Sequence, residues 1–268
     1  SFGYFGGGET KSTVDRIDYS NDTATASPKG PLSIVKQSMG ATGNADFGYF
    51  GGGFSSSPKF STVDRIDYSS DTGTTPTKGP LSSPRHYIAA TGNASFGYFG
   101  GGGDPTTSTV DRIDYYNLAA SSSRANAIPL KGPGNLEVPV SLGAFSRNLG
   151  PQGTDFGYFG GGSPSGPHLS TVDRIDYSND TAAAATKGPL SSARSYLGAT
   201  SSASFGYFGG GNGVVSLVDR VDYSNDTATA LAKGPLSVTR NKSGSTGNAS
   251  FGYFAGGQTP SAVSSVDR

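Results

Sequence analysis

Acidic and basic side chains recur together in this sequence, within the motif Val-Asp-Arg-Ile-Asp-Tyr that first begins at Val14. Grouped carboxylates can act as general acids and bases, or bind calcium through their oxygen atoms. One active site does not need a copy in every repeat, so we interpret these residues as structural. Each arginine is expected to bridge carboxylates within or between repeats as a bidentate pair. The residues assigned to these ion pairs are Asp15, Arg16, Asp18, Asp64, Arg65, Asp67, Asp111, Arg112, Asp114, Asp173, Arg174, Asp176, Asp219, Arg220 and Asp222.

Other residues that could do chemistry give weaker signals. Asp18, Asn21 and Asp22 offer hard oxygen ligands for calcium, but they suit an Asx turn equally well. His86 and His168 are the only histidines and lie in different repeats, which does not support a metal site or a Ser-His-Asp triad. The glycine runs lack the spacing of a phosphate-binding loop, and the absence of cysteine excludes thiolate sites and disulfides. The sequence therefore predicts no catalytic residue, no metal and no cofactor, and a protein that is not an enzyme.

The elements that must position these side chains are set by a repeat, FGYFGGG. Its copies begin at Phe2, Phe47, Phe96, Phe156, Phe205 and Phe251, the last reading FGYFAGG. A period of about 50 residues made of short strands is typical of a propeller blade. The repeat predicts one strand in FGYFGG, a second in the Val-Asp-Arg motif, a third at Thr23–Ala26 and a fourth that ends near Asn44. Because Val14 and Ile17 are an odd number of residues apart, the second strand either contains a bulge or is buried on both faces.

We therefore predict an all-β fold, a β-propeller of four-stranded blades that occupies residues 1–268 as a single domain. The sequence opens at the second strand of one blade and ends within the third strand of another. On this count a six-bladed ring would lack only the innermost strand of the first blade and the outermost strand of the sixth, so six blades are favoured, seven remain open, and a β-solenoid is the alternative.

The order of these features resembles the kelch repeat. A strand ends in a glycine pair (Tyr4 to Gly7), a Val-Asp-Arg strand follows (Val14 to Asp18), and an arginine precedes the next strand (Arg85, Arg194, Arg240). The resemblance implies that the glycine pair ends the second strand of each blade, although the usual kelch tryptophan is missing. The repeated sequence STVDRIDYSNDTATA is also similar to repeats in structural proteins of marine cyanophages. That second resemblance implies a virion or an extracellular appendage.

The third repeat departs from the others because its length is 60 residues and only Lys131-Gly132-Pro133 of the usual pattern is kept between residues 116 and 153. Loops carry function on rigid scaffolds, so this inserted segment is the predicted binding loop, and a tolerated insertion without function is the alternative. Its candidate binding residues are Tyr116, Asn117, Arg124, Asn126, Glu137 and Arg147.

Charge and hydropathy limit the partners. Basic and acidic residues balance at 20 each, which argues against nucleic acid and anionic membranes, and no apolar run is long enough to span a bilayer. We predict a non-enzymatic structural or interaction protein of a phage particle. Its expected partners are other particle proteins, copies of itself, or host-surface glycans. A cell-surface adhesin module and a propeller enzyme that acts on glycans are the alternatives.

Overall fold

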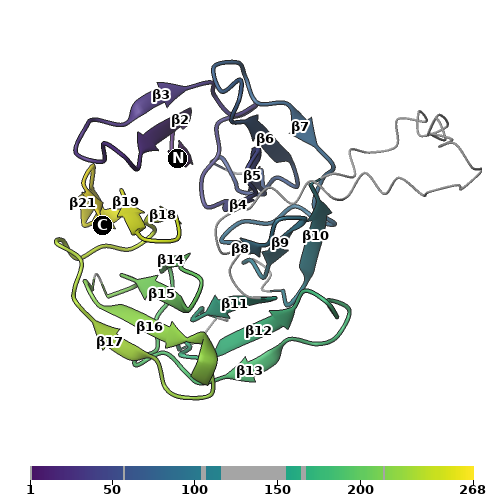
Figure 1. Ribbon diagram of the computed structural model, residues 1–268. Coiled ribbons are helices and arrows are strands. Elements are labelled where there is room, and N and C mark those ends of the chain that lie inside the picture. The colour runs from purple at the N-terminus through teal and green to yellow at the C-terminus, as the bar shows by residue number, and fades with distance from the viewer. Residues whose placement is uncertain (1, 57, 104–106, 116–154, 164–166, 214) are drawn as a thin grey trace, which may run out of the picture.

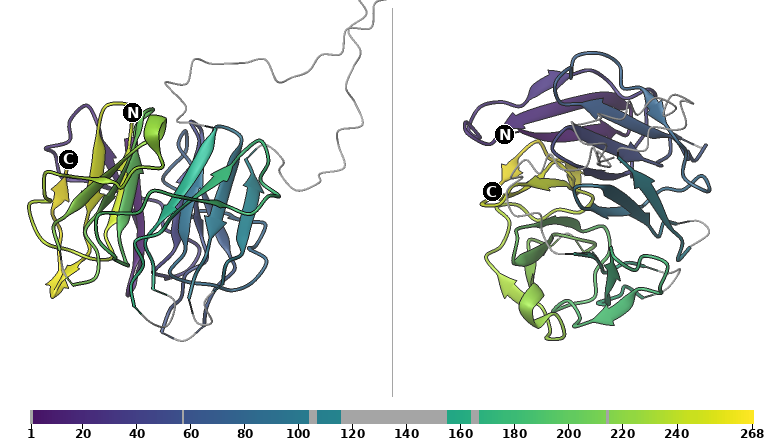
Figure 2. Two further views of the ribbon diagram at one scale, coloured as in Figure 1. Left: turned by 90° about the horizontal axis from the view of Figure 1, so that it is seen from below. Right: turned by 45° about the vertical axis from the view of Figure 1, so that its right-hand side comes forward.

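Six antiparallel sheets surround a common axis in a computed structural model of the chain, and the strands run roughly along that axis (Figures 1 and 2). The structure describes residues 2–268 except 57, 104–106, 116–154, 164–166 and 214. Within that part the only helix is a short 3-10 turn, η1 (Tyr223–Asn225), and no helix is long and apolar enough to cross a membrane. The all-β propeller expected from the repeat is confirmed.

Each of these six sheets is one blade, whose FGYF and Val-Asp-Arg strands come from one repeat; the innermost strand, in the four blades where the structure describes one, comes from the end of the preceding repeat. The first two blades contain β1 (Phe2–Gly8), β2 (Lys11–Asp18) and β3 (Ser27–Lys29), then β4 (Gly40–Gly43), β5 (Phe47–Gly51), β6 (Val63–Asp67) and β7 (Thr77–Lys78). The third and fourth contain β8 (Ala89–Gly92), β9 (Phe96–Gly100) and β10 (Val110–Asp114), then β11 (Phe156–Gly160), β12 (Val172–Asp176) and β13 (Ala185–Lys187). The fifth contains β14 (Gly198–Ser201), β15 (Phe205–Gly209), β16 (Val218–Asp222) and β17 (Leu231–Lys233). The sixth contains β18 (Gly244–Gly247), β19 (Gly252–Ala255) and β22 (Val266–Asp267), with a small hairpin of β20 (Gln258–Thr259) and β21 (Ser261–Ala262).

The two central strands of each blade are the FGYF strand and the Val-Asp-Arg strand, paired in a constant register. In the first blade Tyr4 lies opposite Arg16 and Gly6 lies opposite Val14. Val14 and Ile17 are only 0% and 5% exposed, so the Val-Asp-Arg strand is buried on both faces, the second of the two predicted options. The register shifts instead in β1, around Gly7, whose φ of 76° favours glycine.

The outer strand lies later in the sequence than predicted. Thr23–Ala26 was expected to form it, but the strand is β3 and starts at Ser27. Successive turns occupy the preceding residues, because Asn21 N–H donates to Asp18 O (3.0 Å) and Ala24 N–H donates to Asn21 O (3.2 Å). Those backbone groups are therefore not available to pair with β2, and the ladder resumes only after the turns.

Neighbouring blades interlock through a phenylalanine and a glycine. Phe99 of β9 is fully buried against Gly51 of β5, where an added Cβ would lie 2.6 Å from the Phe99 ring. A larger residue than glycine cannot let the blades approach so closely. The same contact occurs between Gly6 and Phe50, Gly100 and Phe159, Gly160 and Phe208, and Gly209 and Phe254.

The ring closes between the first and sixth blades by side-chain contacts. Tyr19 stacks on Tyr253 with ring centroids 5.0 Å apart, and its hydroxyl lies 2.7 Å from Thr246 Oγ1. Tyr68 and Tyr4 stack in the same way, at 4.8 Å, between the first two blades. The closing interface therefore repeats the internal one, and six blades complete the propeller.

Candidate binding face at the mouth of the propeller

The predicted binding residues of the inserted segment 116–153 lie outside the described residues. These are Tyr116, Asn117, Arg124, Asn126, Glu137 and Arg147. Their assignment to a binding loop stays a prediction.

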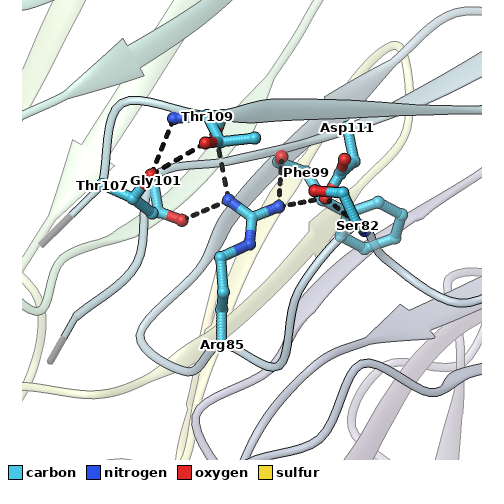
Figure 3. Close-up of polar contacts among 7 residues, drawn as sticks. All are labelled: Ser82, Arg85, Phe99, Gly101, Thr107, Thr109 and Asp111. Atoms are coloured by element: carbon cyan, nitrogen blue, oxygen red, sulfur yellow. Dashed lines mark hydrogen bonds and ion pairs between the residues drawn. The ribbon is translucent and has the colours of Figure 1, made fainter. Parts of the chain in front are cut away.

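The first aspartate of the Val-Asp-Arg motif pairs with a buried cation that precedes the innermost strand. Figure 3 shows this arrangement around Arg85, whose Nη1 donates to Gly101 O (2.7 Å) and Thr109 O (2.9 Å) and whose Nη2 contacts Asp111. Arg85 thereby ties the connection before β8 to β9 and β10. The equivalent pairs are Lys36 with Asp64, Arg194 with Asp219 and Arg240 with Asp267. These carboxylates are therefore part of the framework.

Asp15 and Asp173 occupy the same place in the first and fourth blades. Asp15 lies opposite Phe5 in the β1–β2 register, and Asp173 accepts a hydrogen bond from Thr186 Oγ1 (3.0 Å).

In the part of the chain that the structure describes, no motif arginine forms an ion pair with a motif aspartate; Arg16, Arg112 and Arg174 instead contact a loop aspartate of the next blade. Arg16 Nη1 lies 2.7 Å from Asp71 Oδ2, Tyr4 Oη donates to the same oxygen (2.9 Å), and Lys29 Nζ lies 3.4 Å from Oδ1. The expected bidentate geometry is absent because the tyrosine and the lysine share the carboxylate. Asp180 is bound by Tyr98 and Arg112, Asp226 by Tyr158, Arg174 and Lys187, and Asp22 by Tyr253 and Arg268.

These contacts keep the loop aspartates ionised. Burial alone would raise the pKa of Asp71, but the hydrogen bond from Tyr4 and the charges of Arg16 and Lys29 outweigh it, so the pKa lies below its ordinary value. The hydrogen bond from Arg112 likewise lowers the pKa of Asp180. A carboxylate that accepts these donors is stabilised in its charged form, so each loop aspartate acts as a clasp between blades.

The second aspartate of the motif closes a turn. Asp18 Oδ1 accepts hydrogen bonds from Ser20 N–H (2.9 Å) and Ser20 Oγ (2.7 Å), and these bonds lower its pKa. Asp67, Asp176 and Asp222 make the same turn contacts. Asp18 therefore bonds within its own turn while Asp22 bonds to the sixth blade, and within the described residues no group of three or more His, Cys, Asp or Glu could hold a metal.

The face on which the strands β5 and β9 end carries a position whose residue type differs between repeats. Two residues after each buried cation, the chain places Ser38, Tyr87, Tyr196 and Lys242 in the same backbone position, with φ between 56° and 58°. Such a φ is uncommon for these residue types. It is held by contacts between units, because Tyr87 N–H donates to Ser38 O and Lys242 N–H donates to Tyr196 O, both at 2.9 Å.

Two of these residues form an exposed aromatic pair. The rings of Tyr87 and Tyr196 meet edge to face with centroids 5.2 Å apart, although they come from the third and fifth blades. They remain 40% and 37% exposed. Lys242 Nζ lies 5.5 Å from the centroid of the Tyr196 ring. The blades thus bring aromatic rings and a cation together at one end of the axis, and we call Tyr87, Tyr196 and Lys242 the mouth cluster.

Side chains below the mouth cluster hold it in place. Tyr87 packs against His86 (4.3 Å between centroids) and Phe54 (6.1 Å), and Ser195, the neighbour of Tyr196, lies 3.2 Å from His168 Nδ1. The two histidines therefore support different parts of the face and do not form one site. Burial and the neighbouring Tyr196 raise the pKa of Tyr87, which keeps its phenol protonated and able to donate a hydrogen bond.

The sequence analysis did not predict the mouth cluster, although the distribution of tyrosines in the sequence indicates it. Of the 14 tyrosines, only Tyr87, Tyr116 and Tyr196 stand outside the FGYF and Val-Asp-Arg motifs. Aromatic residues that are not needed by the repeated core are available for binding.

The fold and its repeat contacts define a six-bladed, kelch-like β-propeller. Among solved structures, the chain is similar to YjhT, a kelch-repeat propeller protein, with a TM-score of 0.71 and 13% identity over 99% of this chain and 90% of that one. This likeness shows the fold alone. No family model and no curated protein matches the sequence.

Proposed function

We propose that this protein is a non-enzymatic interaction protein that binds host-surface glycans at the mouth cluster. The observation that carries the proposal is the exposed Tyr87–Tyr196 pair, held on a rigid framework at positions where the repeats differ. Tyrosine is suited to this role because its ring packs against the apolar face of a sugar, its hydroxyl bonds to the sugar's polar edge, and it loses little conformational entropy on binding.

The framework supports binding better than catalysis. Among the motif carboxylates that could serve as acids or bases, Asp111 and Asp219 pair with Arg85 and Arg194, and Asp18 and Asp176 accept hydrogen bonds within their own turns. A glycosidase needs two carboxyl groups in different environments that face one substrate. Preorganised aromatic rings, in contrast, need only a stable backbone, which the closed ring provides.

Substituting both Tyr87 and Tyr196 with alanine is expected to weaken glycan binding by at least about tenfold, since each ring contributes on the order of 1 kcal/mol. Binding of the purified chain to an array of bacterial surface glycans measures this. The matched control is Leu231→Ala, which removes a side chain that is 55% exposed on the outer strand of the fifth blade. Equal binding by the double variant and the control would refute the mouth cluster as the site.

We also propose that the protein is a component of a phage particle, because the sequence of its repeat resembles repeats in structural proteins of marine cyanophages. Immunogold labelling of purified particles and of host cells with an antibody against the folded chain measures the location. We expect gold on a virion appendage. Gold confined to cell envelopes would contradict the phage assignment and favour an adhesin.

A further inference from the structure

A second site follows from the strand that lies closest to the axis in each blade. In four blades this inner strand is β4, β8, β14 or β18, and it pairs with the FGYF strand (Figure 1). Among the residues that the structure describes, the first blade has no inner strand, so β1 is an edge strand of its sheet. An edge strand offers unpaired backbone N–H and C=O groups to another polypeptide.

The second blade shows which backbone groups are concerned. Asn44 N–H donates to Phe47 O (2.9 Å), so Phe47 and, two residues later, Tyr49 direct their backbone groups towards β4. Tyr4 is the residue of β1 that is equivalent to Tyr49, and its backbone groups have no strand to pair with among the described residues.

The four inner strands carry a shared pattern of two side chains. A basic residue before the strand pairs with the first aspartate of the motif, as Arg85 does with Asp111. Six residues later, the hydroxyl of a threonine lies 2.8 Å from the hydroxyl of the motif tyrosine of the next blade, as for Thr91 and Tyr177. The basic residue and the threonine recur as Lys36 and Thr42, Arg194 and Thr200, and Arg240 and Thr246.

The first blade has the groups that this pattern contacts. Asp15 occupies the place of Asp111, and no ion pair or side-chain hydrogen bond reaches it from the described residues. Tyr68 of the second blade occupies the place of Tyr177. Its ring stacks on Tyr4, but its hydroxyl makes no hydrogen bond with the described residues. Burial raises the pKa of Tyr68, so the phenol is protonated and able to donate.

The fourth blade differs from the first in this respect. Its strand β11 is also an edge strand among the described residues. However, Asp173 accepts a hydrogen bond from Thr186 Oγ1 (3.0 Å), and the hydroxyl of Tyr223 is hydrogen-bonded to Ser201. Within the described residues, an aspartate and a tyrosine are therefore left open together only around β1.

The strand register indicates how an incoming segment would lie. In the second blade Thr42 lies opposite Tyr49. A segment in the same register on β1 would place its threonine opposite Tyr4, within reach of Tyr68, and its basic residue at Asp15. The segment 116–153 of this chain contains no threonine, so it does not carry the pattern.

We propose that the first blade binds an extended segment of a partner polypeptide in which an arginine or lysine precedes a threonine by six residues. The segment pairs with β1 as an inner strand, its cation binds Asp15 and its threonine binds Tyr68. Main-chain hydrogen bonds provide the affinity and the two side chains provide the specificity. The site involves no residue of the mouth cluster, so it does not depend on glycan binding.

The test uses a blocked peptide with the sequence of residues 240–248, Arg-Asn-Lys-Ser-Gly-Ser-Thr-Gly-Asn. Titration calorimetry with the purified chain is expected to show one site. Replacing the threonine of the peptide with valine is expected to weaken binding at least about threefold, and replacing its arginine with glutamine at least about tenfold, because the second change removes a charge-assisted bond. Both changes leave the protein itself unaltered.

Two protein variants test the same contacts from the other side. Tyr68→Phe and Asp15→Asn are expected to weaken binding as much as the corresponding changes in the peptide. The matched control is Tyr115→Phe, because the Tyr115 hydroxyl already lies 2.8 Å from Thr42 Oγ1. Hydrogen exchange of the Tyr4 amide, measured by NMR, is expected to slow when the peptide binds, since this N–H would then be paired.

Several outcomes would overturn the proposal. It is wrong if the peptide does not bind, if the valine peptide binds equally well, or if Asp15→Asn and Tyr115→Phe have the same effect. Slow exchange of the Tyr4 amide without peptide would also contradict it, because a segment of the chain itself would then occupy the site. Circular dichroism checks that each variant is folded, and the peptide variants decide the test if one is not.

Discussion

Replacing Lys36 with methionine is expected to lower the free energy of unfolding by about 3–5 kcal/mol, since the change leaves a buried carboxylate without its counterion. The side chains of Lys36 and Asp64 are both 0% exposed, and their charged atoms lie 2.9 Å apart. Lys36 Nζ also donates to Phe50 O (3.2 Å) and Thr62 O (3.3 Å), so the two central strands of the second blade lose a shared donor as well. Urea-induced unfolding measures the loss.

The double variant Lys36→Met/Asp64→Leu distinguishes two causes of this loss of stability. One is the burial of the Asp64 carboxylate without a counterion, and the other is the loss of the attraction between the two side chains. Burial lowers the pKa of Lys36 despite the opposing charge of Asp64, so the cost of burying the ammonium exceeds the benefit of the pair. Apolar side chains of similar size remove that cost on both sides, and the double variant is expected to regain most of the stability. A double variant as unstable as the single one would show that the polar network itself is required. Lys36→Arg, the residue that other repeats use, is the control for folding.

Phe99→Ala is expected to destabilise the protein by a similar amount, about 3–5 kcal/mol, because it opens a cavity in a rigid interface. The ring is 0% exposed and packs with Val63, Leu81 and Ile88 as well as against Gly51 of the preceding blade. The blades cannot move together to fill the space, since the closed ring fixes their separation. Thermal and urea unfolding measure the effect.

Phe5→Ala is the matched control for this substitution. Phe5 occupies the same position of the repeat, but it lies at the closing interface and is only partly buried, against Gly244. A smaller loss is expected there. Equal losses at the two positions would mean that the closing interface is packed as tightly as the internal ones.

The sequence was sufficient for the two central strands of every blade, because FGYF and Val-Asp-Arg combine strand-forming residues with a fixed repeat length. It was not sufficient for the outer strand. Thr23–Ala26 has acceptable strand residues, but the Asp18 side chain accepts a hydrogen bond from Ser20 N–H, and the backbone carbonyls of Asp18 and Asn21 accept from Asn21 N–H and Ala24 N–H, so the turns extend to Ala24. Local hydrogen bonding of this kind competes with strand pairing and is not visible in residue propensities.

The partner of each motif arginine could not be predicted for a different reason. Arg16 reaches Asp71, which is 55 residues away, and the nearer motif carboxylates point elsewhere. The relative position of two blades determines which carboxylate is within reach of the arginine. No local sequence pattern indicates that relative position. The mouth cluster was missed for the same reason, since Tyr87 and Tyr196 meet across an intervening blade.

The positive-φ position that follows each buried cation has a consequence for how this face can change. It holds a serine, two tyrosines and a lysine with nearly the same backbone angle, so its geometry does not depend on the side chain it carries. The hydrogen bonds that maintain it, such as the one from Tyr87 N–H to Ser38 O, use only backbone atoms. The side chain that this face presents at each of these positions can therefore be replaced one residue at a time, while the backbone of the ring beneath stays as it is.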